Sequence, residues 1–258
     1  MPPNLAENYT EKVIYLPHGF VSSKLAISEV PVRRADFSVP ECAFVFCCFN
    51  AAYKIEPVVF AVWMRILQAV PDSVLWLFDD ECATFRENMR HQAESLGVSA
   101  DRFVFAGTLP LAEHLRRCAL ADLFLDTFVY NAGATAVVAL KAGVPVLTVP
   151  GDTYVARMGA SVCAAAGLEE MICNSLEEYE KRAIYFATHR DELAEIRQKL
   201  EANLQTAPLF DTALFIKNLE AALLEILPKP VKPTIEKLPK VSLVMTVYNS
   251  ALYLGLAE

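Results

Sequence analysis

The chain has 258 residues, 54% of them hydrophobic, which is enough to bury one substantial core. Its 23 basic and 31 acidic residues give a formal charge of −8, and this acidic balance argues against binding to a nucleic-acid backbone. No apolar run reaches the roughly 18 residues of a membrane span, and the N-terminus lacks the basic start and apolar stretch of a signal peptide. We therefore expect a cytoplasmic chain without a membrane span.

Residues 1–40 are predicted to be an irregular lead-in or linker that follows an N-terminal half outside this sequence. Pro17, Pro31 and Pro40 divide this stretch into pieces too short to form a core. The pattern changes at "AFVFCCFN" (43–50), a continuous apolar run bounded by turn residues. Such a run is typical of a strand that is covered on both faces.

From this point, predicted strands and helices alternate. The strands are expected at 43–50, 73–78, 102–107, 122–127 and 145–151, and the helices at 57–70, 84–97, 111–121 and 134–143. The alternation predicts parallel βαβ units, and hence an α/β fold with a doubly wound, Rossmann-like parallel sheet and helices on both faces. Ligands of such sheets bind at the carboxyl ends of the strands. The connections 50–54, 108–111, 126–135 and 150–157 should share that rim.

Helical patterns dominate the sequence after residue 157 and trail to residue 227, which completes a predicted domain over 41–227. "PKPVKPTIEKLPK" (228–240) is rich in proline and lysine and is predicted to be a linker. Residues 241–258 resemble the start of a second domain, with a strand, a turn and the beginning of a helix.

The seven cysteines include no CxxC pair and lie mostly in apolar segments. This placement suits reduced thiols within a core better than zinc ligands or disulfides. The sequence therefore offers no metal motif.

Lys54 follows the first predicted strand by a few residues. A lysine at the carboxyl edge of a sheet can place a compact positive charge against a pyrophosphate. A solvated lysine at the start of a helix is the alternative interpretation.

His114 and Arg117 lie three residues apart in "LAEHLRRCALAD" and so share one face of the predicted helix. Together they could hold a base or a phosphate. Histidine and arginine at this spacing are also common on protein surfaces, so the pair alone is a weak signal.

The stretch "VYNAGATAVVALKAGVPVLTVPG" (129–151) places small residues immediately before an apolar helix. Asn131, Gly133, Ala134 and Thr135 lie at the predicted helix start, where unpaired N–H groups and the helix dipole favour an anion. The alternative is an ordinary helix cap made by Thr135 or Asn131.

Six blocks of the sequence, in order, resemble the C-terminal half of the O-GlcNAc transferase and SPINDLY family, glycosyltransferase family 41. They include "EKVIYLPHGFV", "FVFCCFNAAYKIEP", "AEHLRRCALADLFLDTFVYNAGAT" and "KAGVPVLTVPGDTYVARMGAS", and the resemblance covers roughly residues 9–225. The end of the chain, "VSLVMTVYNSALYL", resembles the opening of a family 2, GT-A type glycosyltransferase.

The resemblance implies a GT-B architecture, with this chain as the half that binds a UDP-sugar. It also implies transfer to protein hydroxyls without a metal or another cofactor. Lys54 and the helix start at Gly133, Ala134 and Thr135 would then offset the charge on the departing UDP, and His114 and Arg117 would hold the uridine. In the family, tetratricopeptide repeats that recruit the protein acceptor and a second Rossmann-like half precede this region. Without them, we expect the isolated chain to be inactive in transfer.

The sequence departs from the family pattern at several of these positions. The usual "GHTT" or "GATT" is "AGAT", Ala51 replaces a common glutamine, and Leu111 replaces a common lysine. An acid that holds the ribose is replaced by Val138, which would cost about 1–3 kcal/mol of donor binding. Two alternatives therefore stay open, a degenerate binding or scaffold module and, ranked last, a nucleotide-sugar epimerase relative.

Overall fold

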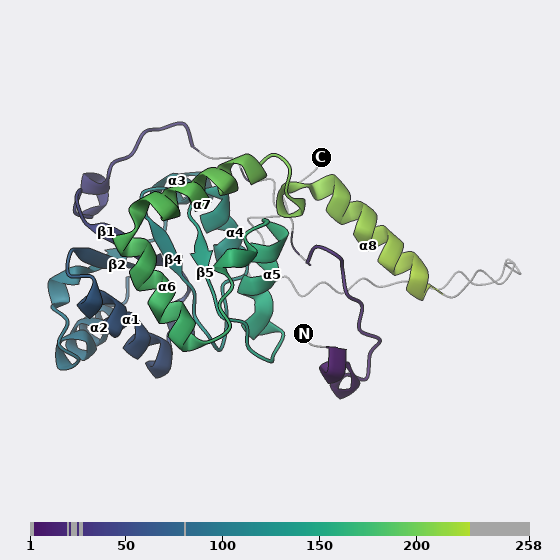
Figure 1. The fold of residues 1–258 in the computed structure, drawn as a ribbon, viewed down its shortest axis with the longest axis horizontal. Helices are drawn as coiled ribbons and strands as arrows, with labels where there is room; N and C mark the ends of the chain where they lie inside the picture. Colours follow the sequence, from purple (N-terminus) through teal and green to yellow (C-terminus); the bar gives the residue numbers. More distant parts are fainter. Residues whose placement is uncertain (1–2, 20, 22–24, 26–27, 80, 228–258) are drawn as a thin grey trace, which may run out of the picture. The chain divides into compact units, whose positions relative to one another are not determined.

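The computed structural model describes residues 3–19, 21, 25, 28–79 and 81–227 (Figure 1). The chain divides into two units, Met1–Ala222 and Leu223–Glu258. Only residues 223–227 of the second unit are described, so the predicted linker at 228–240 and the predicted second domain at 241–258 lie outside the described residues.

A parallel sheet of five strands forms the centre of the first unit (Figure 1). The strands are β1 (Phe44–Cys48), β2 (Ser73–Phe78), β3 (Phe103–Ala106), β4 (Leu123–Leu125) and β5 (Val146–Leu147). Their order in the sheet is β3-β2-β1-β4-β5, and every neighbouring pair is parallel. In the central register, Phe46 pairs with Leu75 on one side and Leu123 on the other. The predicted doubly wound parallel sheet is confirmed.

The helices cover the sheet in two layers. They are α1 (Pro57–Ala69), α2 (Ala83–Ser95), α3 (Leu111–Cys118), α4 (Ala134–Lys141), α5 (Met158–Ala165), α6 (Leu176–Thr188) and α7 (Arg190–Asn203). In one layer, α1 packs on α6 and α6 packs on α7. In the other layer, α4 packs on both α3 and α5. A further helix, α8 (Thr212–Ile226), runs from the first unit into the second.

Local sequence signals explain where the helices begin. Glu56 caps α1 by accepting hydrogen bonds from the N–H groups of Val58 (2.6 Å) and Val59 (2.8 Å), and Pro57 occupies the first helical position. Ser175 caps α6 by accepting a bond from the Glu178 N–H at 3.1 Å.

The core explains why the strands are continuous apolar runs. All five residues of β1 are buried, because helices cover both faces of the sheet. Trp63 of α1 and Trp76 of β2 are among the largest fully buried side chains.

The fifth strand is shorter than its apolar run predicts. The run at 145–151 contains only Val146 and Leu147 as a strand. Beyond them, Thr148 exchanges its backbone hydrogen bonds with Met171 (3.1 Å) and Cys173 (2.9 Å) and forms an isolated parallel bridge to Ile172. The chain after Leu147 therefore pairs with a later segment.

The end of the predicted lead-in packs against the sheet. Val39 is buried in the core. Phe37, at the end of the short 3-10 helix Arg34–Phe37, is partly buried and packs against the same core. Arg34 donates to the carbonyls of Ala43 (2.8 Å) and Leu120 (3.1 Å) and pairs with the Asp122 carboxylate at 2.9 Å. One guanidinium thus fastens this segment to the amino ends of β1 and β4.

We predict that Arg34→Ala lowers the free energy of unfolding by about 2–4 kcal/mol, because it leaves several half-buried acceptors unpaired. The neighbouring Arg33 is a matched control, since its only side-chain ion pair among the described residues is an exposed one to Asp36 at 3.6 Å. Arg33→Ala should cost less than about 0.5 kcal/mol in urea unfolding. Equal losses in the two variants would contradict the anchoring role of Arg34.

Candidate functional site

The candidate site lies where the strand order reverses. Strands β1, β2 and β3 progress toward one edge of the sheet, and β4 and β5 toward the other, so the reversal falls between β1 and β4. In parallel α/β sheets this position, at the carboxyl ends of the strands, is where ligands bind. Two connections meet there, the β1–α1 connection (49–56) and the β4–α4 loop (126–133).

Lys54 joins these two connections. It ends the short 3-10 helix Ala52–Lys54, and its Nζ donates to the carbonyl oxygen of Asn131 at 3.0 Å. The same ammonium lies 3.9 Å from the centre of the Tyr130 ring, a cation–π contact. Lys54 is therefore held against the loop, which disagrees with the alternative of a freely solvated lysine.

Burial lowers the pKa of Lys54, and the nearby Asp126 carboxylate acts in the opposite direction. A partly desolvated ammonium attracts an anion more strongly than a fully hydrated one, because less water screens its charge. Lys54 can thus supply a compact positive charge to a ligand at this rim.

Helix α4 begins at this rim without a side-chain cap. Gly133 is its N-cap residue, no side chain of the described residues caps the helix, and its first turn contains no acidic residue. Ala134 is exposed and Thr135 half-buried. The alternative of an ordinary cap by Thr135 or Asn131 is therefore wrong. The first turn keeps uncapped N–H groups at the positive end of the helix dipole.

Gly133 also meets a packing constraint. A Cβ at this position would overlap with Cε of Met158, the first residue of α5. The absence of a side chain at Gly133 thus leaves room for the terminal methyl of Met158 against the start of α4.

Asn131 contributes through its backbone. Its side chain is fully buried, and Nδ2 donates to the carbonyl of Thr127 at 2.5 Å. Its own N–H donates to the Val155 carbonyl at 3.0 Å, which ties the β4–α4 loop to the β5–α5 connection. In this position the side chain shapes the loop, while the backbone carbonyl accepts from Lys54.

His114 and Arg117 form a connected pair on α3. Arg117 is only 2% exposed; its Nη1 donates to the Gly107 carbonyl at 2.7 Å, and its Nη2 lies 2.8 Å from Nδ1 of His114. Because arginine can only donate, Nδ1 is the acceptor, and the neutral imidazole carries its proton on Nε2. The His114 ring packs edge-on against Phe49, at the end of β1, with 5.2 Å between ring centres.

Arg117 therefore acts as a buried support, and His114 is the member of the pair that can offer an N–H to a ligand. Burial, reinforced by the Arg117 charge, lowers the pKa of His114 to about 4. The ring is neutral near pH 7 and can act as a hydrogen-bond donor without carrying charge.

The sequence analysis did not single out Asp126, the first residue of the β4–α4 loop. It is fully buried and accepts from the N–H groups of Thr127 (2.8 Å) and Ala132 (2.7 Å) and from the Thr148 hydroxyl (2.7 Å). Burial raises its pKa to about 7, although these hydrogen bonds act in the opposite direction. The available signal was an acidic residue that ends a buried apolar strand, "LFLD".

Arg157, a further cation of this rim, is committed to its own loop, because its Nη1 donates to the Gly151 carbonyl at 2.8 Å. Within the described part of the chain, no group of three or more His, Cys, Asp or Glu side chains is placed to hold a metal ion.

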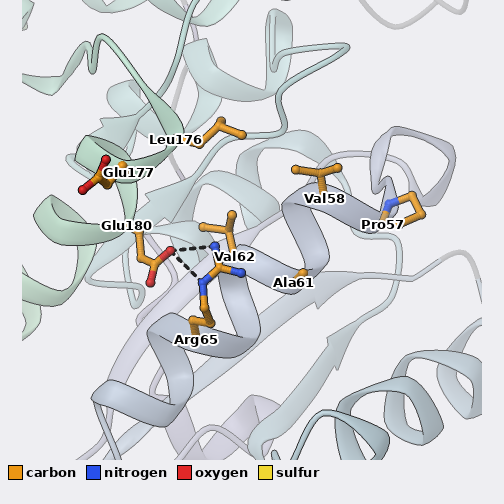
Figure 2. Close-up of a pocket in the computed structure, with 8 residues that line it drawn as sticks. All are labelled: Pro57, Val58, Ala61, Val62, Arg65, Leu176, Glu177 and Glu180. Carbon is orange, nitrogen blue, oxygen red and sulfur yellow. Dashed lines mark hydrogen bonds and ion pairs between the residues drawn. The ribbon is translucent and has the colours of Figure 1, made fainter.

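A separate surface groove of about 450 Å³ lies between α1 and α6 (Figure 2). Its apolar lining includes Val58, Val62 and Leu176, and the ion pair between Arg65 and Glu180 (2.7 Å) crosses it. None of the predicted site residues lines this groove.

Comparisons with known proteins bear on the identity of the chain. A family model described as glycosyl transferase family 41 matches residues 21–219. The chain is 38% identical over 227 residues to a probable UDP-N-acetylglucosamine–peptide N-acetylglucosaminyltransferase, SEC, of Arabidopsis thaliana, which covers 85% of this chain and 23% of the relative. It is 34% identical over 187 residues to the corresponding enzyme of Caenorhabditis elegans, with 72% of this chain and 16% of the relative covered.

Among solved structures, the chain is similar to a lysine-to-methionine mutant of the O-GlcNAc transferase of Thermobaculum terrenum. The TM-score is 0.77 at 28% identity, over 86% of this chain and 42% of the other. The chain spans less than a quarter of the length of the two curated relatives. No helix of the described residues is both long and apolar enough to cross a bilayer.

We predict that the His114 ring stays neutral from about pH 5.5 to 8, because its pKa is lowered to about 4. The measurement is an NMR titration of the imidazole resonances. In Arg117→Met the pKa should rise but remain below 6.5, since burial is the larger cause. A wild-type midpoint near 6.5 would contradict this environment.

We also predict that Asp126 makes the protein less stable as the pH rises from about 4 to 7. Over this range the unfolded carboxyl loses its proton while the folded one, with a pKa of about 7, retains it. The slope from this one group reaches about 1.4 kcal/mol per pH unit.

Urea unfolding of wild type and Asp126→Asn at several pH values measures this contribution. The stability of the variant relative to wild type should increase with pH. A constant difference between the two proteins would show that Asp126 does not titrate in this range.

Proposed function

Because the chain belongs to glycosyltransferase family 41, we propose that it is the UDP-sugar-binding half of a GT-B protein O-glycosyltransferase. In the proposed reaction, the complete enzyme transfers a hexose or N-acetylhexosamine from a UDP-sugar to a serine or threonine hydroxyl. The family match extends over most of the chain, as its resemblance to O-GlcNAc transferases and SPINDLY proteins predicted. The observation that carries the proposal is the 3.0 Å contact of Lys54 Nζ with the Asn131 carbonyl, beside the uncapped start of α4.

This arrangement suits a diphosphate leaving group. When the bond between the sugar and UDP breaks, negative charge develops on the β-phosphate oxygen. The ammonium of Lys54 and the first N–H groups of α4, at Gly133, Ala134 and Thr135, can offset that charge without a metal. We propose that Lys54 exchanges its contact with the Asn131 carbonyl for a phosphate oxygen when the donor binds.

The uridine end of the donor is assigned to His114. Its neutral ring can donate through Nε2 to an oxygen of the base or ribose. Arg117 holds that ring through Nδ1 and would act as a positioning residue, not as a ligand contact.

We assign binding of the acceptor to other parts of the complete enzyme. The names of the curated relatives specify UDP-N-acetylglucosamine and a peptide, and we propose the same classes of donor and acceptor for the complete enzyme. A second Rossmann-like half would supply the opposite wall of the active site, and tetratricopeptide repeats would recruit the acceptor. We retain the cytosol as the proposed compartment because all seven cysteines are free and five of them are buried.

Val138 favours a second candidate, a binding or scaffold module that no longer uses UDP-sugars. The residue lies in α4 and is 5% exposed, and it replaces the acid expected to hold the ribose. The two candidates differ in whether this chain binds UDP.

We predict that the chain binds UDP in a calorimetric titration and that Lys54→Ala weakens binding about 10- to 100-fold. This range corresponds to the loss of a charged hydrogen bond to phosphate, about 1.5–3 kcal/mol. CDP and GDP test selectivity for the base and should bind more weakly.

Lys181→Ala is the matched control, because this exposed lysine of α6 pairs only with Glu177 among the described residues. It should leave the affinity for UDP unchanged. If wild type binds none of the three nucleotides at millimolar concentrations, the scaffold candidate replaces the donor-binding one.

A further inference from the structure

We infer that Asp126 is a positioning residue for the diphosphate site, because its hydrogen bonds fix the backbone of the β4–α4 loop. The inference rests on the proposed function and deepens it, because it identifies what holds the loop that Lys54 and α4 share. Asp126 is fully buried, so it acts through its neighbours and does not contact a ligand.

One carboxylate oxygen closes the loop. Oδ1 accepts from the N–H of Thr127 at 2.8 Å and from the N–H of Ala132 at 2.7 Å, five residues further along the chain. The Asn50 amide, which follows β1, donates to the same oxygen at 3.3 Å and to the Thr127 hydroxyl at 2.9 Å. Oδ1 thus joins both ends of the loop to Asn50. This residue lies in the β1–α1 connection, which also carries Lys54.

The other oxygen faces the opposite side. Oδ2 accepts from the Thr148 hydroxyl at 2.7 Å, just beyond β5. Gly159 of α5 packs directly on this pair, since a Cβ there would overlap with both Oδ2 and Thr148 Oγ1. The carboxylate is therefore enclosed between β1, β5 and α5, which leaves it little freedom to move.

The backbone of Asp126 is held as firmly as its side chain. Its carbonyl accepts from the Tyr179 hydroxyl at 3.0 Å, and the Trp63 indole N–H donates to the same hydroxyl at 3.1 Å. Helices α1 and α6 are thereby joined to the residue that begins the loop.

The loop carries the carbonyl that holds Lys54 before the donor binds and the helix start that the proposed diphosphate site needs. Asn131, whose carbonyl receives Lys54, comes immediately before Ala132, and Gly133, the N-cap of α4, comes immediately after it. The bond from Ala132 to Oδ1 therefore fixes the backbone between these features. Without it, both would move relative to Lys54, and placement errors of this kind are costly at a binding site.

The test compares the affinities of the chain for UDP and UMP by calorimetry. Loss of overall stability would weaken both ligands alike, whereas displacement of the loop would weaken UDP more, since only UDP has the β-phosphate. We expect Asp126→Ala to lower the ratio of UDP affinity to UMP affinity by about tenfold. Asp126→Asn should keep the ratio within about threefold of wild type, because its amide oxygen can accept the same backbone N–H bonds.

Thr148→Val is the matched control. It removes the donor to Oδ2 and lowers stability, but leaves every bond to Oδ1, so the affinity ratio should not change. If Asp126→Ala does not fold, Asp126→Ser replaces it. The serine oxygen lies one bond closer to the backbone than Oδ1, so it cannot keep the contacts with both the Thr127 and the Ala132 N–H groups, and the ratio should fall in the same direction.

A folded Asp126→Ala variant with the wild-type ratio would overturn the inference and leave the proposed function intact. Where only Asp126→Ser folds, an unchanged ratio in that variant has the same meaning. Failure of wild type itself to bind UDP would instead overturn the proposed function, and the inference with it.

Discussion

The parallel crossovers of the sheet are the constraint from which the candidate site follows. Because every strand of the sheet runs in the same direction, all carboxyl ends meet at one edge. The order reverses between β1 and β4, so the connections that follow these two strands lie next to each other. Lys54 and the Asn131 carbonyl come from these connections, and their 3.0 Å contact joins residues that are 77 positions apart in the chain.

The polar residues at this rim divide into two groups. Lys54, His114 and the first turn of α4 can reach a ligand, whereas Arg117, Asn131 and Asp126 are buried and hold the first group in place. Each buried residue is hydrogen-bonded to the backbone, although Nε of Arg117 and Oδ1 of Asn131 have no hydrogen-bond partner among the described residues. The distinction explains why substitutions beneath the rim are expected to alter ligand affinity without removing a ligand contact.

Features set by local pattern were predictable from the sequence, and those set by tertiary contacts were not. The strand at 73–78 was predicted at its observed bounds, because a continuous apolar run between turn residues marks a buried strand. The strand at 145–151 was predicted too long, because its run does not reveal that Thr148 pairs with the segment around Ile172. Apolar pattern alone cannot identify a hydrogen-bond partner.

At the site, too, some features were predictable from local sequence pattern and others depend on tertiary contacts. Strand topology places Lys54 and the start of α4 on one rim, as the sequence predicted. Arg117 and Asn131 were predicted as ligand-binding residues, and their assignment to the UDP site stays untested. Their burial, which depends on neighbours distant in sequence, gives them supporting positions. Asp126 was not singled out, because a single acidic residue after a strand has no distinguishing spacing.

The central claim is that a diphosphate binds between Lys54 and the start of α4. The most direct measurement is a backbone NMR spectrum of the chain with and without UDP. The account predicts that the amide resonances of Gly133, Ala134 and Thr135 shift most, together with the resonances of Lys54. Shifts confined to the groove between α1 and α6, or a spectrum unchanged by UDP, would contradict it.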